Sequence, residues 1–227
     1  FPLDVINYTQ RISEKKEQNK TSARRDFRKK TTFTIDPVTA KDFDDAISYA
    51  PLAGNKIEIG IHIADVSHYV KPNSILDEEA YERATSVYLV DRVVPMLPEL
   101  LSNGVCSLRP KEEKFTFSAV FVLNEKMVIE EEWFGKTLIY SDHRFSYEEV
   151  QSILDSEDKK VTADVSLSGQ SYSVSEKIYS ALLKLNSYAK FLREKRMKKG
   201  ALSFDRVEVK FDLDKQDNPN SIYFKTS

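Results

Sequence analysis

Cysteine is almost absent from this chain, which holds a single one, Cys106, among 227 residues. One cysteine cannot form an intramolecular disulfide and excludes metal or iron–sulfur sites that need several thiolates, so the reducing cytosol is the expected compartment. The chain also lacks a hydrophobic run approaching the roughly 20 residues of a membrane span, and its N-terminus lacks the basic-then-apolar order of a signal peptide. We therefore expect a soluble, cytoplasmic protein with no membrane partner.

Neither sign of charge is in excess, because 34 Lys and Arg face 36 Asp and Glu, a formal net charge of −2. The distribution is uneven: residues 11–30 hold nine basic and three acidic side chains, a net +6, which leaves −8 on the other residues. A basic segment beside an acidic body suits a polyanion held near acidic metal ligands. A charge run alone is more often a solvated lead-in, and both interpretations of residues 11–30 stay open.

Hydrophobic residues make up 41% of the chain, with 13 Phe and 11 Tyr among them, which excludes an intrinsically disordered protein. The length corresponds to one large domain or two small ones. Isoleucines alternate at 57, 59, 61 and 63, as a half-buried strand requires, and Pro51, Gly54 and Asn55 mark the turn before them. Strand patterns dominate the first two-thirds of the chain, at 31–35, 43–50, 56–63, 115–123 and 127–139, and resume at 202–211 and 221–225.

Helices are predicted by their start signals. The pairs Ser146 with Glu149 and Ser173 with Glu176 have capping-box spacing, in which a hydroxyl and a carboxylate satisfy each other's amide donors. The second helix carries an apolar stripe to about residue 199 and ends before Gly200. With a short helix at 75–84 and a surface loop at 156–172, the expected fold is α+β: a mostly antiparallel sheet packed with helices.

The segment with the clearest chemistry is an acidic cluster at residues 34–46, with the sequence TIDPVTAKDFDDA. Its four carboxylates, Asp36, Asp42, Asp44 and Asp45, fall within ten residues and are flanked by strand-forming hydrophobic residues. Like charges this close raise one another's pKa and destabilise the fold unless a cation compensates them. Alternation along an extended chain puts Asp42 and Asp44 on one face and Asp45 on the other, while the turn at Pro37 lets Asp36 return to the same site. The alternative is a set of N-caps and turn residues.

The donor types narrow the choice of metal. An EF-hand loop starting at Asp42 needs Gly and Glu where Ile47 and Ala53 stand, so that motif is excluded. Zinc is disfavoured because His62, His68 and His143 lack ligand-like partners, and we expect His62 to be structural and His68 to lie on the surface. Oxygen-only donors favour Mg²⁺, or Mn²⁺, and carboxylate-bound magnesium keeps positions open for water and a substrate phosphate.

Residues 34–46 resemble the signature that opens the catalytic domain of the ribonuclease II / ribonuclease R (RNB) family, and the AKDFDDA wording is closer to the ribonuclease R branch. The resemblance continues through an ordered series of segments: 24–28 (RRDFR), 61–70 (IHIADVSHYV), 85–88 (TSVY), 95–98 (PMLP), 101–108 (LSNGVCSL) and 200–204 (GALSF). From their charge we expect residues 1–30 to be a basic lead-in segment, and the resemblance implies that residues 31–227 are the N-terminal portion of an incomplete RNB catalytic domain. We expect the chain to be a piece of a longer polypeptide, since it opens on Phe1.

The resemblance implies a magnesium-dependent, processive 3′-to-5′ exoribonuclease that releases nucleoside 5′-monophosphates from the 3′ end of single-stranded RNA. Asp36 and Asp45 match direct metal ligands, and Asp42 matches a ligand that acts partly through water. Asp44 matches the catalytic carboxylate whose loss stops chemistry while sparing RNA binding. The family also implies flanking OB-fold domains in the parent chain.

Two aromatic residues match RNA-binding positions of the family. Tyr88 matches the tyrosine that stacks on the 3′-terminal base and helps to set the length of the limit product, and Phe204 matches the aromatic on the other side of that base. Stacking of this kind is worth ~1–3 kcal/mol per base and tolerates any sequence. Taken singly, each residue would be read as core packing.

Part of the family's active site cannot be located in this chain. The later part of the family's catalytic domain supplies an arginine that holds the scissile phosphate and a final acidic residue, so we expect the 227 residues alone to be weakly active or inactive. One alternative is a non-catalytic RNA-binding module of the same family, against which the presence of all four aspartates argues. Another is a magnesium phosphohydrolase acting on a small substrate, for which Tyr88→Ala should change nothing.

Overall fold

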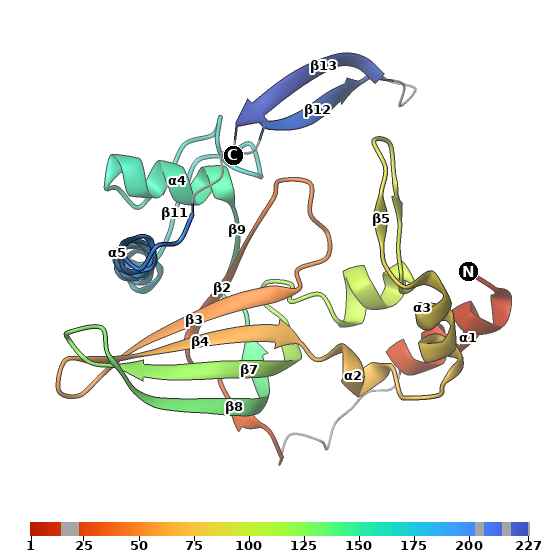
Figure 1. Cartoon of the computed structure of the whole chain (residues 1–227), viewed down its shortest axis with the longest axis horizontal. Helices are drawn as coiled ribbons and strands as arrows, with labels where there is room; N and C mark the ends of the chain where they lie inside the picture. Colours follow the sequence, from red (N-terminus) through yellow and green to blue (C-terminus); the bar gives the residue numbers. More distant parts are fainter. Residues whose placement is uncertain (15–22, 203–206, 215–218, 227) are drawn as a thin grey trace.

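The computed structural model describes residues 1–14, 23–202, 207–214 and 219–226 (Figure 1). Its centre is a seven-stranded sheet with the strand order β1-β8-β7-β4-β3-β2-β9. Neighbouring strands are antiparallel except for the two outer pairs, β1 with β8 and β2 with β9, which are parallel. The strands are β1 (Arg25–Asp26), β2 (Thr31–Asp36), β3 (Asp45–Leu52), β4 (Lys56–Ala64), β7 (Glu113–Leu123), β8 (Ile129–Tyr140) and β9 (His143–Ser146). The predicted α+β class with a mostly antiparallel sheet is confirmed.

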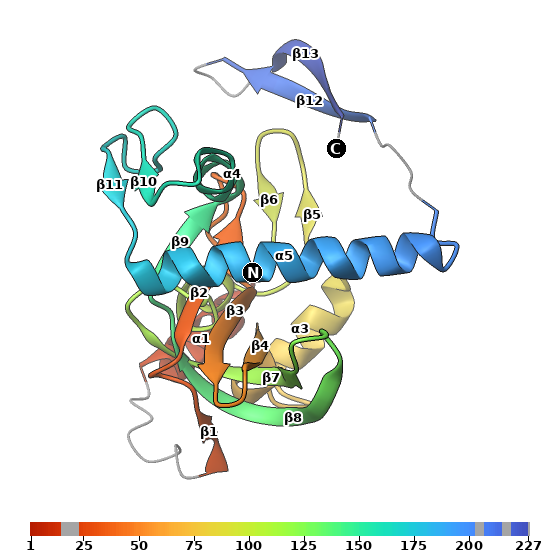
Figure 2. The same cartoon turned by 90° about the vertical axis from the view of Figure 1, so that its left-hand side faces the viewer.

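Helices cover the two ends of this sheet, and each end has its own hydrophobic core. At one end α1 (Leu3–Ser13) packs against α3 (Ile75–Arg83) and the π-helical turn η2 (Leu100–Val105), with α2 (Val66–Tyr69) close by (Figure 1). At the other end α4 (Tyr147–Ser156) and the long α5 (Glu176–Lys198) pack together, and α5 passes in front of the sheet in Figure 2. Fully buried side chains mark the two cores: Phe27, Leu76 and Leu101 in the first, and Phe33, Phe145 and Ile153 in the second.

Three short two-stranded sheets complete the described structure: β5 (Val87–Tyr88) with β6 (Val93–Val94), β10 (Lys160–Val161) with β11 (Tyr172–Ser173), and β12 (Val207–Leu213) with β13 (Pro219–Thr226). Both views show the β12–β13 hairpin standing apart from the large sheet (Figures 1 and 2). Within the described parts of the chain, no helix combines the length and the hydrophobicity of a membrane span.

The helix starts bear out one of the two predicted capping boxes. Ser146 accepts from the Glu149 amide at 3.1 Å, and the Glu149 carboxylate accepts from the Ser146 amide at 2.9 Å. The second prediction was wrong, since α5 is capped by Ser175, whose hydroxyl accepts from the Ile178 amide. Ser173 instead pairs with Lys160 between β11 and β10, and this pairing delays the start of the helix by two residues.

The alternating isoleucines do form a strand, β4, but not with the expected burial along its whole length. Ile57 is buried, whereas Ile61 and Ile63 are 43% and 48% exposed. The opposite face of β4 is buried instead, and it carries His62 in a layer of hydroxyl groups. Residues 1–30, expected as a lead-in segment, include α1 and β1, neither of which the sequence pattern had predicted.

Candidate active site around the acidic loop

The acidic cluster occupies the connection between two adjacent strands of the large sheet. Asp36 ends β2 and Asp45 begins β3, so residues 37–44 form a loop, here called the acidic loop. The strand predicted from residue 43 begins two residues later, and Asp42 therefore belongs to the loop and not to a strand. A turn closed by the Ala40 amide on the Pro37 carbonyl, at 3.0 Å, starts the loop.

The return side of the loop is fixed by a buried serine. Ser107 Oγ accepts from the Phe43 amide at 3.0 Å and donates to the Lys41 carbonyl at 3.1 Å. The next residue, Leu108, donates its amide to the Phe43 carbonyl at 2.8 Å. These three bonds hold the backbone on both sides of Asp42, while the Asp42 side chain stays half-exposed.

The outgoing side of the loop is held by Arg144 on β9. Parallel pairing sets Arg144 opposite Thr34 on β2, and from there Arg144 Nη2 donates to the carbonyls of Pro37 at 2.8 Å and Val38 at 3.0 Å. The guanidinium carbon also lies 5.2 Å from the centre of the Phe43 ring, within range of a cation–π contact. One arginine thus touches both the outgoing and the returning limb of the acidic loop.

The carboxylates of this region lie close enough to change one another's protonation. Burial, followed by the charges of Asp45 and Asp44, raises the pKa of Asp36, and the nearby Thr34 hydroxyl and Arg144 oppose this shift only in part. The pKa of Asp44 is raised by desolvation and then by the charges of Asp42 and Asp45. The folded chain therefore brings mutually repelling carboxylates together, as the spacing of the cluster predicted.

Unpaired polar atoms test whether the site suits a cation. Within the described parts of the chain, Asp36 Oδ2, Thr34 Oγ1 and Arg144 Nε are buried and have no hydrogen-bond partner. A buried carboxylate oxygen without a donor, beside further aspartates, fits a hard divalent cation such as Mg²⁺ or Mn²⁺. No three His, Cys, Asp or Glu side chains among the described residues already stand in a metal-holding arrangement. The donors fit the ion by their chemistry, and their present spacing is not that of a finished coordination shell.

Tyr88 stands beside the acidic loop on the short β5–β6 hairpin (Figure 1). Its side chain is 69% exposed, and its hydroxyl donates to Asp42 Oδ2 at 3.4 Å. The charge of Asp42 is the main cause that raises the pKa of Tyr88, followed by burial and the charge of Asp44. An aromatic ring so exposed is not packed in a core. The hydrogen bond from its hydroxyl to Asp42 places Tyr88 beside the site carboxylates. Phe204, the other predicted aromatic, lies outside the described residues.

The three histidines, His62, His68 and His143, are not among the groups that shift the pKa values of Asp36 and Asp44. His62 is fully buried between Ser118 Oγ at 2.6 Å and Ser48 Oγ at 2.9 Å, and burial lowers its pKa to about 4. It is the structural histidine that the sequence predicted. His68, expected on the surface, is half-buried, with its Nδ1 3.3 Å from Arg24 Nη2.

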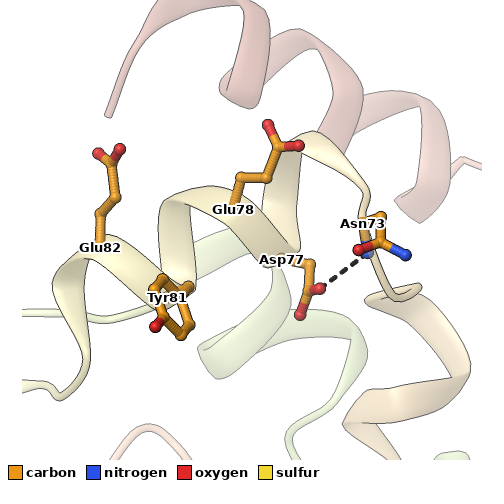
Figure 3. Close-up of a pocket in the computed structure, with 5 residues that line it drawn as sticks. All are labelled: Asn73, Asp77, Glu78, Tyr81 and Glu82. Atoms are coloured by element: carbon orange, nitrogen blue, oxygen red, sulfur yellow. Dashed lines mark hydrogen bonds between the residues drawn. The ribbon is translucent and has the colours of Figure 1, made fainter.

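A shallow pocket of about 340 Å³ lies elsewhere, on α3 and the turn before it (Figure 3). Asn73, Asp77, Glu78, Tyr81 and Glu82 line it, and Asp77 Oδ2 accepts from the Asn73 amide at 2.8 Å. None of the predicted site residues takes part in this pocket.

Sequence reasoning missed two residues that build the acidic loop. Ser107 lies inside the 101–108 segment that carries the family resemblance, so its position was a usable signal. Arg144 had none, because it acts across 107 positions of sequence and only through the parallel pairing of β9 with β2.

Comparison with known proteins assigns the family. The family model described as RNB domain matches residues 24–227 of the sequence, and the chain therefore belongs to the RNB family. It is 42% identical over 200 residues to the DIS3-like exonuclease 2 of Xenopus tropicalis, covering 88% of this chain and 24% of that protein. It is 40% identical over 215 residues to the ribonuclease R of Thermotoga maritima, covering 94% of this chain and 29% of that protein.

A solved structure supports the same assignment. The ribonuclease R of Mycoplasma genitalium, in complex with ribose-methylated single-stranded RNA, matches with a TM-score of 0.86 and 27% identity, covering 99% of this chain. The family and the RNB-type fold expected from the sequence are thus confirmed. The chain spans 24% and 29% of the two sequence relatives and 33% of the solved chain.

Proposed function

We propose that the full-length protein is a cytoplasmic, magnesium-dependent exoribonuclease that degrades single-stranded RNA processively from its 3′ end to nucleoside 5′-monophosphates. One observation carries this proposal: the acidic loop and the strand ends beside it bring repelling carboxylates and an unpaired buried oxygen, Asp36 Oδ2, close to the exposed ring of Tyr88. Such a site offers donors for a hard cation and a stacking surface within one region. The names of the relatives, an exonuclease and two ribonucleases R, point to the same substrate class.

Each predicted side chain has a role in this proposal. Asp36 and Asp45 hold Mg²⁺ or Mn²⁺ directly and Asp42 in part through water, while Asp44 serves the hydrolytic step. When bound, such a cation activates water and stabilises charge on the scissile phosphate. A bound cation would offset the burial and the repulsion that raise the pKa values of Asp36 and Asp44.

Tyr88 provides the RNA contact of the proposal. An exposed ring next to the metal-binding carboxylates can stack on the terminal base and bring the last phosphodiester bond to them. Phe204 is proposed to face Tyr88 across that base. Flanking OB-fold domains in the full-length protein would hold the rest of the single strand and support processivity.

The test is a ladder assay with a 5′-labelled single-stranded RNA, run with Mg²⁺ and with EDTA. The full-length protein should shorten the RNA from its 3′ end only with Mg²⁺, whereas the isolated 227-residue chain should show little or no activity. Asp155→Asn, an exposed carboxylate on α4, is the matched control for the site aspartates and should cleave like the wild type. RNA binding by the full-length protein without Mg²⁺-dependent cleavage would contradict the proposal and favour a non-catalytic RNA-binding module.

A further inference from the structure

We propose that Arg144 is a positioning residue which, together with Ser107, presets the acidic loop so that Asp42 and Asp44 lie beside Asp36 and Asp45 around one divalent cation. This inference rests on the proposed function, because it assigns the residues that organise the same site. Neither side chain need touch RNA or the cation. Both act through the backbone that carries Asp42 and Asp44.

Hydrogen bonds from two side chains hold both limbs of the acidic loop. A loop in which several carboxylates repel one another tends to spread, and its backbone needs fixed points to keep them together. Arg144 supplies two hydrogen bonds to the outgoing limb, at the carbonyls of Pro37 and Val38, and Ser107 supplies two to the returning limb, at Lys41 and Phe43. Charge-assisted bonds such as those of Arg144 are about twice as strong as neutral ones. The two residues therefore hold the backbone of both limbs, and the two Ser107 bonds lie on either side of Asp42.

The shape of the arginine side chain suits these contacts. Its planar guanidinium can serve two neighbouring carbonyls and still lie against the Phe43 ring, 5.2 Å away. A lysine ammonium keeps the charge but lacks this planar fork, so it cannot reproduce the three contacts together. Arg144→Lys thus removes the geometry while retaining the charge.

Positioning of the loop by Arg144 and simple charge compensation by Arg144 have opposite consequences for metal binding. The positive charge of Arg144 stabilises the nearby Asp36 carboxylate, and a neutral residue there would remove a cation from the surroundings of the metal site. If charge compensation were the only role of Arg144, then Arg144→Met should bind a divalent cation more tightly than the wild type. If positioning dominates, both Arg144→Lys and Arg144→Met should bind it more weakly.

The experiment measures Mn²⁺ binding to the full-length protein by titration calorimetry, with no RNA present. Arg144→Lys, Arg144→Met and Ser107→Ala should each weaken Mn²⁺ binding, by about tenfold for the arginine variants, as is typical when residues that orient metal ligands are removed. Arg25→Met is the matched control, because Arg25 also lies over aromatic rings and its guanidinium also donates to oxygen, that of the Glu58 carboxylate, but on β1. It should bind Mn²⁺ like the wild type.

Hydrogen exchange in EDTA provides a second readout that does not depend on metal or activity. The amides of residues 38–44 should exchange about tenfold faster in Arg144→Met than in Arg25→Met, reflecting the loss of charge-assisted hydrogen bonds. If Arg144→Met fails to fold, Ser107→Ala, which removes one hydroxyl group, carries the same comparison.

The possible failures are distinguishable. Wild-type Mn²⁺ binding with equal or tighter binding by Arg144→Met, or unchanged exchange of residues 38–44, would overturn the positioning role and leave the proposed function intact. Absence of Mn²⁺ binding by the wild type would refute the metal site of the proposed function, and the positioning role with it.

Discussion

Asp44 offers a measurable consequence of packing carboxylates together. All the causes that change its pKa raise it: desolvation first, then the charges of Asp42 and Asp45. No favourable partner offsets them, so the ionised Asp44 destabilises the folded protein whenever no cation is bound. We predict that Asp44→Asn, which removes the charge and nearly keeps the shape, makes the metal-free protein more stable at neutral pH.

The size and pH dependence of this effect follow from the surroundings of Asp44. Its side chain is exposed to solvent, which screens the repulsion, so the gain should be about 0.5–1 kcal/mol. If the 227 residues unfold as one cooperative unit, the gain corresponds to an increase of about 1–4 °C in the Tm of that unit. Because the pKa of Asp44 in the folded state lies above the ordinary value of 3.8, the wild type loses stability as the pH rises from 3.8 through the folded-state pKa. The difference between the two proteins should therefore disappear as the pH is lowered toward 3.8 and stay constant at neutral pH.

Thermal unfolding of the full-length protein in EDTA, at several pH values, is the assay. Asp155→Asn on α4 removes an exposed carboxylate outside the acidic loop and should leave Tm nearly unchanged. With saturating Mg²⁺ the order should reverse, since binding to the native state stabilises the wild type more than a variant that lacks one site carboxylate. An Asp44→Asn protein that is less stable than the wild type in EDTA at neutral pH would refute this reasoning.

Three further predictions concern other parts of the chain. Tyr88→Ala should weaken RNA binding by about 1–3 kcal/mol and lengthen the limit product in a ladder assay, whereas Tyr88→Phe should keep both because the ring remains; an unchanged end product in Tyr88→Ala would exclude stacking. Mn²⁺ binding, measured by calorimetry, should weaken as the pH falls below neutral, because protons compete for Asp36, whose pKa is raised by burial and by neighbouring carboxylates; equal affinity across that range would argue against Asp36 as a ligand. Arg24→Ala should destabilise the fold by about 3–5 kcal/mol in thermal unfolding, since it strands Asp65 in a buried ion pair whose side chains are 4% and 2% exposed, while the exposed Arg28→Ala should change little.

Local patterns sufficed for much of the fold. The turn at Gly54 and Asn55, both with positive φ, joins β3 and β4 as predicted, and the Ser146 capping box starts α4. These features depend on residues within a few positions of one another, so their signals are present in the sequence. The prediction of Ser173 as a helix cap was wrong because Ser173 pairs with Lys160, a residue distant in sequence, and this strand pairing competes with the capping-box signal.

Burial and the construction of the site depended on contacts between distant residues. Ile61 and Ile63 alternate as a strand should, but the alternation could not say which face is covered, and the buried face holds His62 and its hydroxyl partners. The aspartates were visible because they are close in sequence. Arg144 was not visible, since its approach to Pro37 and Val38 requires the parallel pairing of β9 with β2.

The most direct measurement of the central claim compares cleavage and RNA binding by full-length Asp44→Asn with those of the wild type, in Mg²⁺ and on the same labelled single strand. A catalytic site in the acidic loop predicts that the variant binds RNA with unchanged affinity while cleavage falls by at least about 10²-fold. Equal cleavage by the variant and the wild type would contradict a catalytic role for the acidic loop.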